Sequence, residues 1–93
     1  MTRIALITGA SGGLGRAFVA ELIAQGWCVA AGYHRENIHP ETDSLLPVPL
    51  DVTSRDAVAA AVAQVLARWQ RIDLLINNAG NTADNLSWLL TDE

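Results

Sequence analysis

The 93-residue sequence contains no lysine and only one tyrosine, Tyr33. An ordinary P-loop nucleoside triphosphatase needs a lysine beside its phosphates, so the composition excludes that class. A mechanism that depends on lysine, or on a tyrosine at another position, cannot be completed by these residues alone. The single cysteine, Cys28, cannot form an internal disulfide, and its apolar neighbours favour a buried strand residue over a reactive thiol.

Long apolar runs and clusters of basic residues are also missing. The apolar stretches are short and are interrupted by glycine or polar residues, so we expect neither a secretory signal nor a membrane segment. The net charge is −4 and the arginines are scattered, which leaves no electrostatic footprint for a nucleic acid. We therefore expect a cytoplasmic protein without nucleic-acid or membrane partners. The length and the 51% hydrophobic content indicate one small globular domain over residues 1–93.

Four apolar stretches have the composition of strands, and two segments between them repeat apolar residues at helical spacing. The predicted strands are 3–8, 27–33, 45–50 and 72–80, and the predicted helices are 13–25, which Gly26 would end, and 51–70, with Thr53 or Ser54 as N-cap. The predicted apolar helix faces consist of Leu14, Phe18, Val19, Leu22 and Ile23 in the first helix and Val58, Val62, Val65, Leu66 and Trp69 in the second.

This alternation of strands and helices predicts an α/β fold with a parallel sheet covered by helices on both faces. The strand at 45–50 carries Pro47 and Pro49, which lack backbone donors, so we expect it at a sheet edge. The polar segment 34–44 has room for only a turn or two of helix. Residues 81–93 read as a loop followed by the start of a helix.

The stretch ITGASGGLG, residues 7–15, lies between the first predicted strand and the first predicted helix. Unpaired N–H groups and the positive end of the dipole at a helix start favour an anion, and glycines let the backbone approach a phosphate. The Gly-x-Gly-x-x-Gly dinucleotide pattern is not met, because Ser11 stands where its second glycine belongs. Taken alone, the loop is either a phosphate site or a turn that only lets strand and helix pack.

Two further motifs stand at later strand ends, Asp51-Val52-Thr53 after the third strand and Asn77-Asn78-Ala79-Gly80 after the fourth. Together with the run from Thr8 to Gly15, and in this order, they resemble the short-chain dehydrogenase/reductase family of oxidoreductases. Within this family, residues 77–93 look most like the 3-oxoacyl-carrier-protein and acetoacetyl-CoA reductases. The resemblance implies a Rossmann-type sheet, here incomplete, with about four strands in the order 3-2-1-4.

The resemblance also implies that these motifs hold a nicotinamide dinucleotide. Asp51 would accept a hydrogen bond from the adenine amino group with Val52 beside the ring, and Asn77 would help to hold the central strands together. From the residues alone, Asp51 could instead cap the following helix. The residues expected to surround the pyrophosphate and the adjoining ribose are Gly9, Ser11, Gly12, Gly13, Leu14 and Gly15. Those expected on the adenosine-ribose side are Asn78, Ala79 and Gly80.

The end of the second strand decides between the two nicotinamide dinucleotides, since an acid there bonds the ribose 2′-hydroxyl and repels a 2′-phosphate. Here Tyr33 is followed by His34 and Arg35, and we expect these three residues to contact the cofactor. Arg35 can bind a phosphate in bidentate fashion, so the sequence favours NADP(H) over NAD(H). Alternatively, Arg35 is a solvated residue paired with Glu36. We interpret His34 and His39 as solvated loop histidines and predict no metal site.

For the family, the resemblance implies hydride transfer to a carbonyl, here of a 3-oxoacyl thioester, with a tyrosine as proton donor and a lysine that lowers its pKa. No residue of this chain matches that pair, so we assign no catalytic residue. We expect the chain to be the first part of a longer, homo-oligomeric reductase whose small carbonyl substrate binds elsewhere. Two alternatives stay open: a stand-alone NADP(H)-binding redox sensor, and a structural fragment that binds no cofactor.

Overall fold

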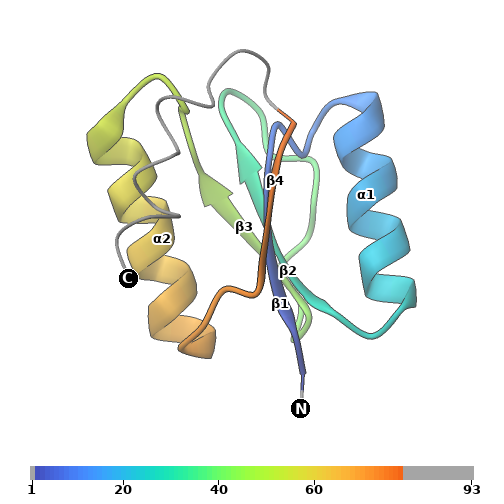
Figure 1. The fold of residues 1–93 in the computed structure, drawn as a ribbon. Helices are drawn as coiled ribbons and strands as arrows, with labels where there is room; N and C mark the ends of the chain where they lie inside the picture. The colour runs from blue at the N-terminus through green and yellow to red at the C-terminus, as the bar shows by residue number, and fades with distance from the viewer. Residues whose placement is uncertain (1, 79–93) are drawn as a thin grey trace.

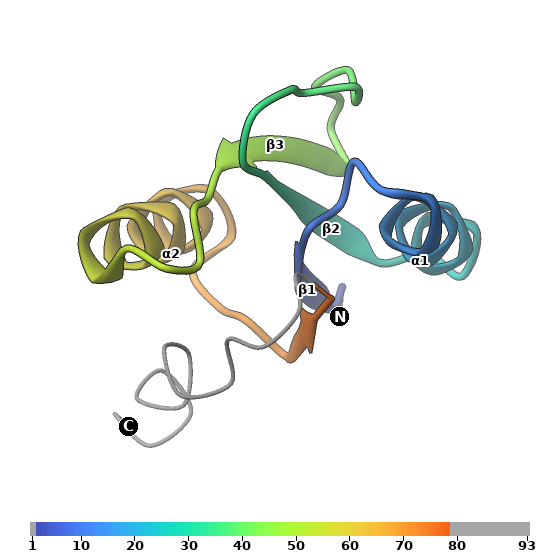
Figure 2. The same cartoon turned by 90° about the horizontal axis from the view of Figure 1, so that it is seen from above.

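The computed structural model describes residues 2–78, which form a single parallel sheet flanked by two helices. Within this range the strands lie in the order β3-β2-β1-β4, and all neighbouring pairs are parallel. Figures 1 and 2 show α1 and α2 on opposite faces of the sheet. The predicted α/β class and strand order are therefore confirmed. The elements are β1 (Ile4–Thr8), α1 (Gly13–Ala24), β2 (Cys28–Tyr33), β3 (Leu45–Pro49), α2 (Arg55–Trp69) and β4 (Leu74–Asn77).

The sheet is covered on both faces, and β1 at its centre shows this most clearly because all five of its residues are buried. Alternate residues of a strand point to opposite faces. Leu6 accordingly packs in the cluster on the α2 side and Ile7 in the cluster on the α1 side. The α2-side cluster consists of Ile4, Leu6, Ala30, Val48, Leu50, Val52, Val58, Ala61 and Val65. The α1-side cluster consists of Ile7, Ala10, Val19, Val29, Ala31 and Leu45.

Two leucines predicted on the apolar helix faces are exposed instead. Leu14 is 62% exposed because it stands in the first turn of α1, where the helix has only just left the glycine loop. Leu66 is 42% exposed, whereas Val65 beside it is fully buried. Successive residues on a helix point about 100° apart, so the buried stripe of α2 excludes the position next to Val65. Periodicity therefore predicted a wider apolar face than the structure has.

The segment 34–44 connects β2 to β3 without forming a helix, so the turn or two for which it had room is not formed. Figure 2 shows this green segment arching over β3. At its far end Arg68 of α2 donates from Nη1 to a Glu41 carboxylate oxygen at 3.0 Å and from Nη2 to the Thr42 carbonyl at 2.7 Å. The segment is thus tied to the end of α2 by side-chain contacts.

The outer strands differ in how their sequences fit their positions. In the described part of the chain β3 pairs only with β2, as its prolines predicted. Cys28 opens β2 and is half-buried against the α2-side cluster, less enclosed than predicted. The expectations for residues 79–93 lie outside the described residues. Within 2–78, no helix is long and apolar enough to cross a membrane.

Candidate functional site

The glycine loop, defined here as residues 9–12, joins the end of β1 to the start of α1 by a tight turn. Gly9 has a φ of 64°, a conformation that favours glycine, and Gly12 N donates to Gly9 O at 3.3 Å. A Cβ on Gly15 would lie 2.2 Å from Gly9 O and 2.8 Å from Ala10 Cα. Only glycine at position 15 therefore lets the first turn of α1 start this close to β1.

The first turn of α1 is open toward solvent and lacks a side-chain cap. The N-cap residue is Gly12, and among residues 2–78 no side chain caps this turn and no acid lies within it. A Cβ on Gly13 would meet nothing within 4 Å. The first backbone N–H groups of a helix have no intrahelical acceptor, and here they remain accessible to an anion.

The turn after β4 is hydrogen-bonded to the end of β1 and to the glycine loop. The Thr8 hydroxyl donates to Asn77 Oδ1 at 3.1 Å and accepts from Asn78 N at 2.9 Å. Asn78 Nδ2 donates to Gly9 O at 3.1 Å. Asn77 thus links β4 to β1, the role that the family resemblance implied. Thr8 is fully buried. Its role could not be recognised from the sequence, because a single polar residue at the end of an apolar strand is common.

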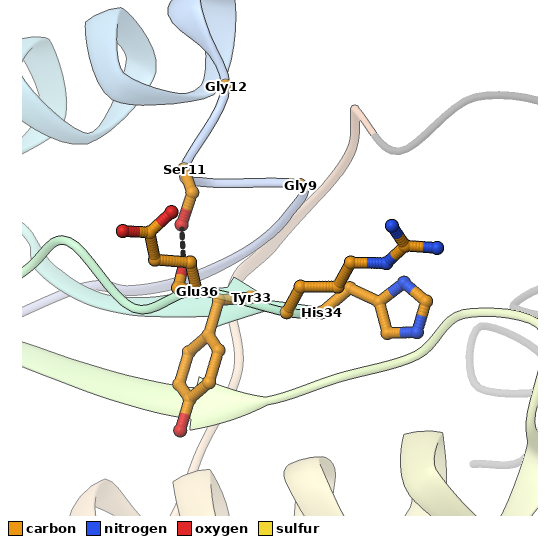
Figure 3. A pocket seen from close by; sticks show the side chains of 7 residues that line it. Gly9, Ser11, Gly12, Tyr33, His34 and Glu36 are labelled. Atoms are coloured by element: carbon orange, nitrogen blue, oxygen red, sulfur yellow. Dashed lines mark hydrogen bonds between the residues drawn. The ribbon is translucent and has the colours of Figure 1, made fainter.

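The glycine loop, the end of β2 and the residues that follow it line an open pocket of about 350 Å³. Figure 3 shows the Ser11 hydroxyl directed at Glu36, whose carbonyl accepts its hydrogen bond at 2.7 Å, while the Tyr33 ring extends away from Ser11 and Gly12. From the sequence, Glu36 was considered only as an ion-pair partner of Arg35, because its approach to the glycine loop depends on the course of segment 34–44. The lining residues are Gly9, Ser11, Gly12, Tyr33, His34, Arg35 and Glu36.

Arg35 lines this pocket and is exposed. Among residues 2–78 it forms no ion pair, so the alternative in which it is paired with Glu36 is not observed. His34 is exposed as predicted. His39 is not: it is half-buried, and its ring nitrogen Nε2 lies 2.9 Å from Ala10 O. Its interpretation as a solvated loop residue was wrong, because the folded segment brings it onto the glycine loop.

Asp51 follows β3 and is held by the turn that leads into α2. Its Oδ1 accepts hydrogen bonds from Thr53 Oγ1 at 2.6 Å and from Thr53 N at 3.0 Å, and its Oδ2 lies 3.5 Å from His34 Nε2. The Thr53 hydrogen bonds hold the pKa of this carboxyl below its usual range, with a smaller contribution from His34. The N-cap of α2 is Ser54, which accepts from Ala57 N at 3.1 Å, so the helix-cap alternative for Asp51 was wrong.

The structure therefore brings three strand ends together at the carboxyl edge of the sheet, where ligands bind in open α/β folds. Asp51 reaches the pocket only through His34, and Val52, 6% exposed, packs in the α2-side cluster. Their contacts with adenine stay predictions, and Ala79 and Gly80 lie outside the described residues. Across the described range, no group of His, Cys, Asp and Glu side chains could hold a metal ion.

Comparison with known proteins gives matches along nearly the whole chain. Residues 3–93 match the family described as short chain dehydrogenase. The acetoacetyl-CoA reductase of Rhizobium meliloti is 39% identical over a 97-residue alignment that covers 100% of this chain and 40% of the relative. A 3-oxoacyl-(acyl-carrier-protein) reductase of Staphylococcus aureus is 35% identical over a 95-residue alignment that covers 92% of this chain and 39% of the relative.

The fold is found in solved structures as well. A short-chain dehydrogenase from Streptomyces avermitilis superposes with a TM-score of 0.77 at 35% identity, over 87% of this chain and 32% of that one. A short-chain dehydrogenase/reductase from Serratia marcescens gives a TM-score of 0.73 at 30% identity. The chain thus spans less than half the length of these relatives.

Proposed function

Because this chain belongs to the short-chain dehydrogenase/reductase family, we propose that it binds NADP(H) at the carboxyl edge of its sheet. It would form the cofactor-binding portion of an oxidoreductase that reduces a carbonyl to a hydroxyl. When bound, NADPH supplies the hydride for this reduction. The residues of this chain bind and orient the dinucleotide.

The observation that carries the proposal is the uncapped start of α1 beside the pocket. A pyrophosphate needs backbone donors that can be approached closely, and the glycines at positions 12 and 13 leave that approach open. Within residues 2–78 no acidic side chain occupies the first turn of α1, so a bound anion would meet the positive end of the helix dipole without competition there.

The preference for NADP(H) over NAD(H) rests on Arg35. Arg35 lines the pocket, and its guanidinium forms no ion pair with any residue between 2 and 78, so it is available for a 2′-phosphate. Glu36 lines the same pocket, and its carboxylate would repel a phosphate. The net preference therefore depends on the guanidinium lying nearer the 2′ position than the carboxylate does.

We propose a 3-oxoacyl thioester as the substrate, because the relatives include a 3-oxoacyl-(acyl-carrier-protein) reductase and an acetoacetyl-CoA reductase. The chemical step is not assigned to these 93 residues, since they contain no lysine and their only tyrosine lines the dinucleotide pocket. A cytoplasmic location and homo-oligomeric assembly stay predictions from the sequence and the family resemblance.

A titration of the chain with NADPH and NADH, followed by the fluorescence of the reduced nicotinamide, tests the proposal. We expect the wild-type chain to bind NADPH more tightly than NADH. Arg35→Ala should weaken NADPH binding by about 10- to 100-fold, the value of a hydrogen bond to a charged group, and leave NADH binding nearly unchanged. Arg55→Ala, on the exposed first residue of α2, is the matched control. Absence of binding by the wild-type chain would favour the structural-fragment alternative.

A further inference from the structure

Two hydrogen bonds hold the first half of segment 34–44 on the glycine loop. The Ser11 hydroxyl donates to Glu36 O at 2.7 Å, and the His39 ring lies against Ala10 O with Nε2 at 2.9 Å. The partners are 25 and 29 residues apart in the sequence, so both contacts depend on the fold and not on a local turn. Segment 34–44 is therefore fastened across the loop that we propose to bind the pyrophosphate.

The chemistry of the His39 contact makes it independent of the ring's charge. A carbonyl oxygen only accepts hydrogen bonds, so Nε2 must carry the hydrogen in this contact. Both the neutral Nε2–H ring and the doubly protonated ring can therefore donate to Ala10 O. The backbone N–H of His39 donates to Asn37 Oδ1 at 2.9 Å, which orients the residue from its own side.

Ala10 is a fixed point for this contact. It is fully buried, and its backbone N–H donates to Gly32 O in β2 at 2.9 Å. His39 therefore ties segment 34–44 to an atom that is itself anchored to the sheet. Removing the His39 ring would free the segment at this point without disturbing the hydrogen bond that anchors Ala10.

The residues that lead from β2 up to these two ties form the outer wall of the pocket. This wall, residues 33–36, is fixed by β2 at one end and by the Ser11 and His39 contacts at the other. His39 itself does not line the pocket. We infer that His39 is a positioning residue that sets the selectivity between NADP(H) and NAD(H) by holding Arg35 at the 2′ position. This inference rests on the proposed function.

The other end of the same segment supplies a matched control. Arg68 holds it through Glu41 and the Thr42 carbonyl, on the side away from the pocket wall. Arg68→Met removes both contacts and keeps a long side chain. If general loosening of the segment changed selectivity, this variant would do so as well. A positioning role at the wall predicts an effect for His39 variants only.

To test the inference, the dissociation constants for NADPH and NADH are measured for the wild-type chain and for the variants His39→Ala, His39→Gln and Arg68→Met. We expect His39→Ala to lower the NADPH-over-NADH preference about fivefold, the effect of losing one hydrogen bond. His39→Gln can donate from its side-chain amide and should restore the preference, and Arg68→Met should retain it. An unchanged preference in His39→Ala, or an equal loss in Arg68→Met, would overturn the inference alone. A wild-type chain that binds neither dinucleotide would overturn the proposed function and the inference with it.

A second measurement needs no cofactor. Trypsin cleaves after arginine, and Arg35 lies in the wall that His39 is inferred to hold. Cleavage after Arg35 should be faster in His39→Ala than in the wild-type chain, and at the wild-type rate in His39→Gln and Arg68→Met. If His39→Ala is folded and is cleaved after Arg35 at the same rate as the wild-type chain, the inference is contradicted.

Discussion

The two helices of this protein begin in opposite ways. At the start of α2 the Ser54 side chain accepts a hydrogen bond from Ala57 N, and Asp56 places a negative charge in the first turn. At the start of α1, Gly12 has no side chain to offer, and no acid stands in the first turn. Both helices leave the same edge of the sheet, so the difference lies in the residues and not in the position.

The comparison shows that the N-terminal N–H groups of a helix can either be capped by the chain's own side chains, which adds stability, or be left to bind a ligand. A side-chain cap contributes about 1 kcal/mol, and an acid in the first turn adds a smaller favourable interaction with the helix dipole. α2 has both contributions from its own residues. α1 has neither, and its exposed donors and positive dipole end are left for a ligand. The helix start that lacks a cap, that of α1, is the one that we propose binds the dinucleotide.

The largest effect on this comparison is expected from Gly15→Ala. The new Cβ would meet the backbone at Gly9 O and Ala10 Cα, neither of which can move without displacing β1 or α1. We expect a loss of unfolding free energy of about 3 kcal/mol or more, measured by thermal or denaturant unfolding. Gly13→Ala is the matched control, because a Cβ at this position meets nothing within 4 Å. This variant should stabilise the helix by a few tenths to about 1 kcal/mol.

The next effect is expected from giving α1 a cap like that of α2. Gly12 has φ −78° and ψ 170°, which an aspartate can adopt, and its Cβ would be only in van der Waals contact with Gly9 O at 3.7 Å. Gly12→Asp should stabilise the fold by a few tenths of a kcal/mol. It should weaken NADPH binding by about 100-fold, since its carboxylate would occupy the anion site. Unchanged binding would show that the pyrophosphate does not use this helix start.

A smaller effect is expected from removing the cap of α2. Ser54→Ala leaves the Ala57 N–H without its side-chain acceptor and should lower the unfolding free energy by about 1 kcal/mol. Ser54→Asp keeps an acceptor at the same place and should retain the stability. Neither variant should change the affinity for NADPH, measured by the same fluorescence titration. A loss of affinity in Ser54→Ala would show that the two helix starts are coupled.

The smallest effect is expected from acid. The pKa of Asp51 is held below its usual value of 3.8 by the Thr53 hydrogen bonds, so its stabilising contribution is fully present above that value. The contribution is lost as the pH falls from about 4 through the lowered pKa. The protection factors of amides at the start of α2, which correct exchange rates for their intrinsic pH dependence, should therefore fall on acidification more than those at the start of α1. In Asp51→Asn this excess should disappear.

Local patterns in the sequence predicted the elements but not the contacts between distant residues. The apolar run of β1, the prolines of β3 and the serine before α2 each carry a local signal, and the structure agrees with all three. The exposure of Leu14 and Leu66 depends on where each helix crosses the sheet, which periodicity does not encode.

The candidate site shows the same limit. The glycines could be recognised from their spacing, because their chemistry is local. The approach of Glu36 to Ser11 and of His39 to Ala10 could not, because each joins residues more than 20 positions apart through an irregular segment. Side-chain hydrogen bonds between distant segments leave no periodic trace in a sequence.

The carbonyl of Gly9 has one further consequence. It accepts hydrogen bonds from Gly12 N and from Asn78 Nδ2, and the latter partner is 69 residues away. Contacts of such long sequence separation form late in folding, because the loop that they close is costly in entropy. During synthesis the glycine loop leaves the ribosome before Asn78 does, and it cannot take its final shape until Asn78 has followed. Dinucleotide binding by the nascent chain would therefore indicate that β4 has paired with β1.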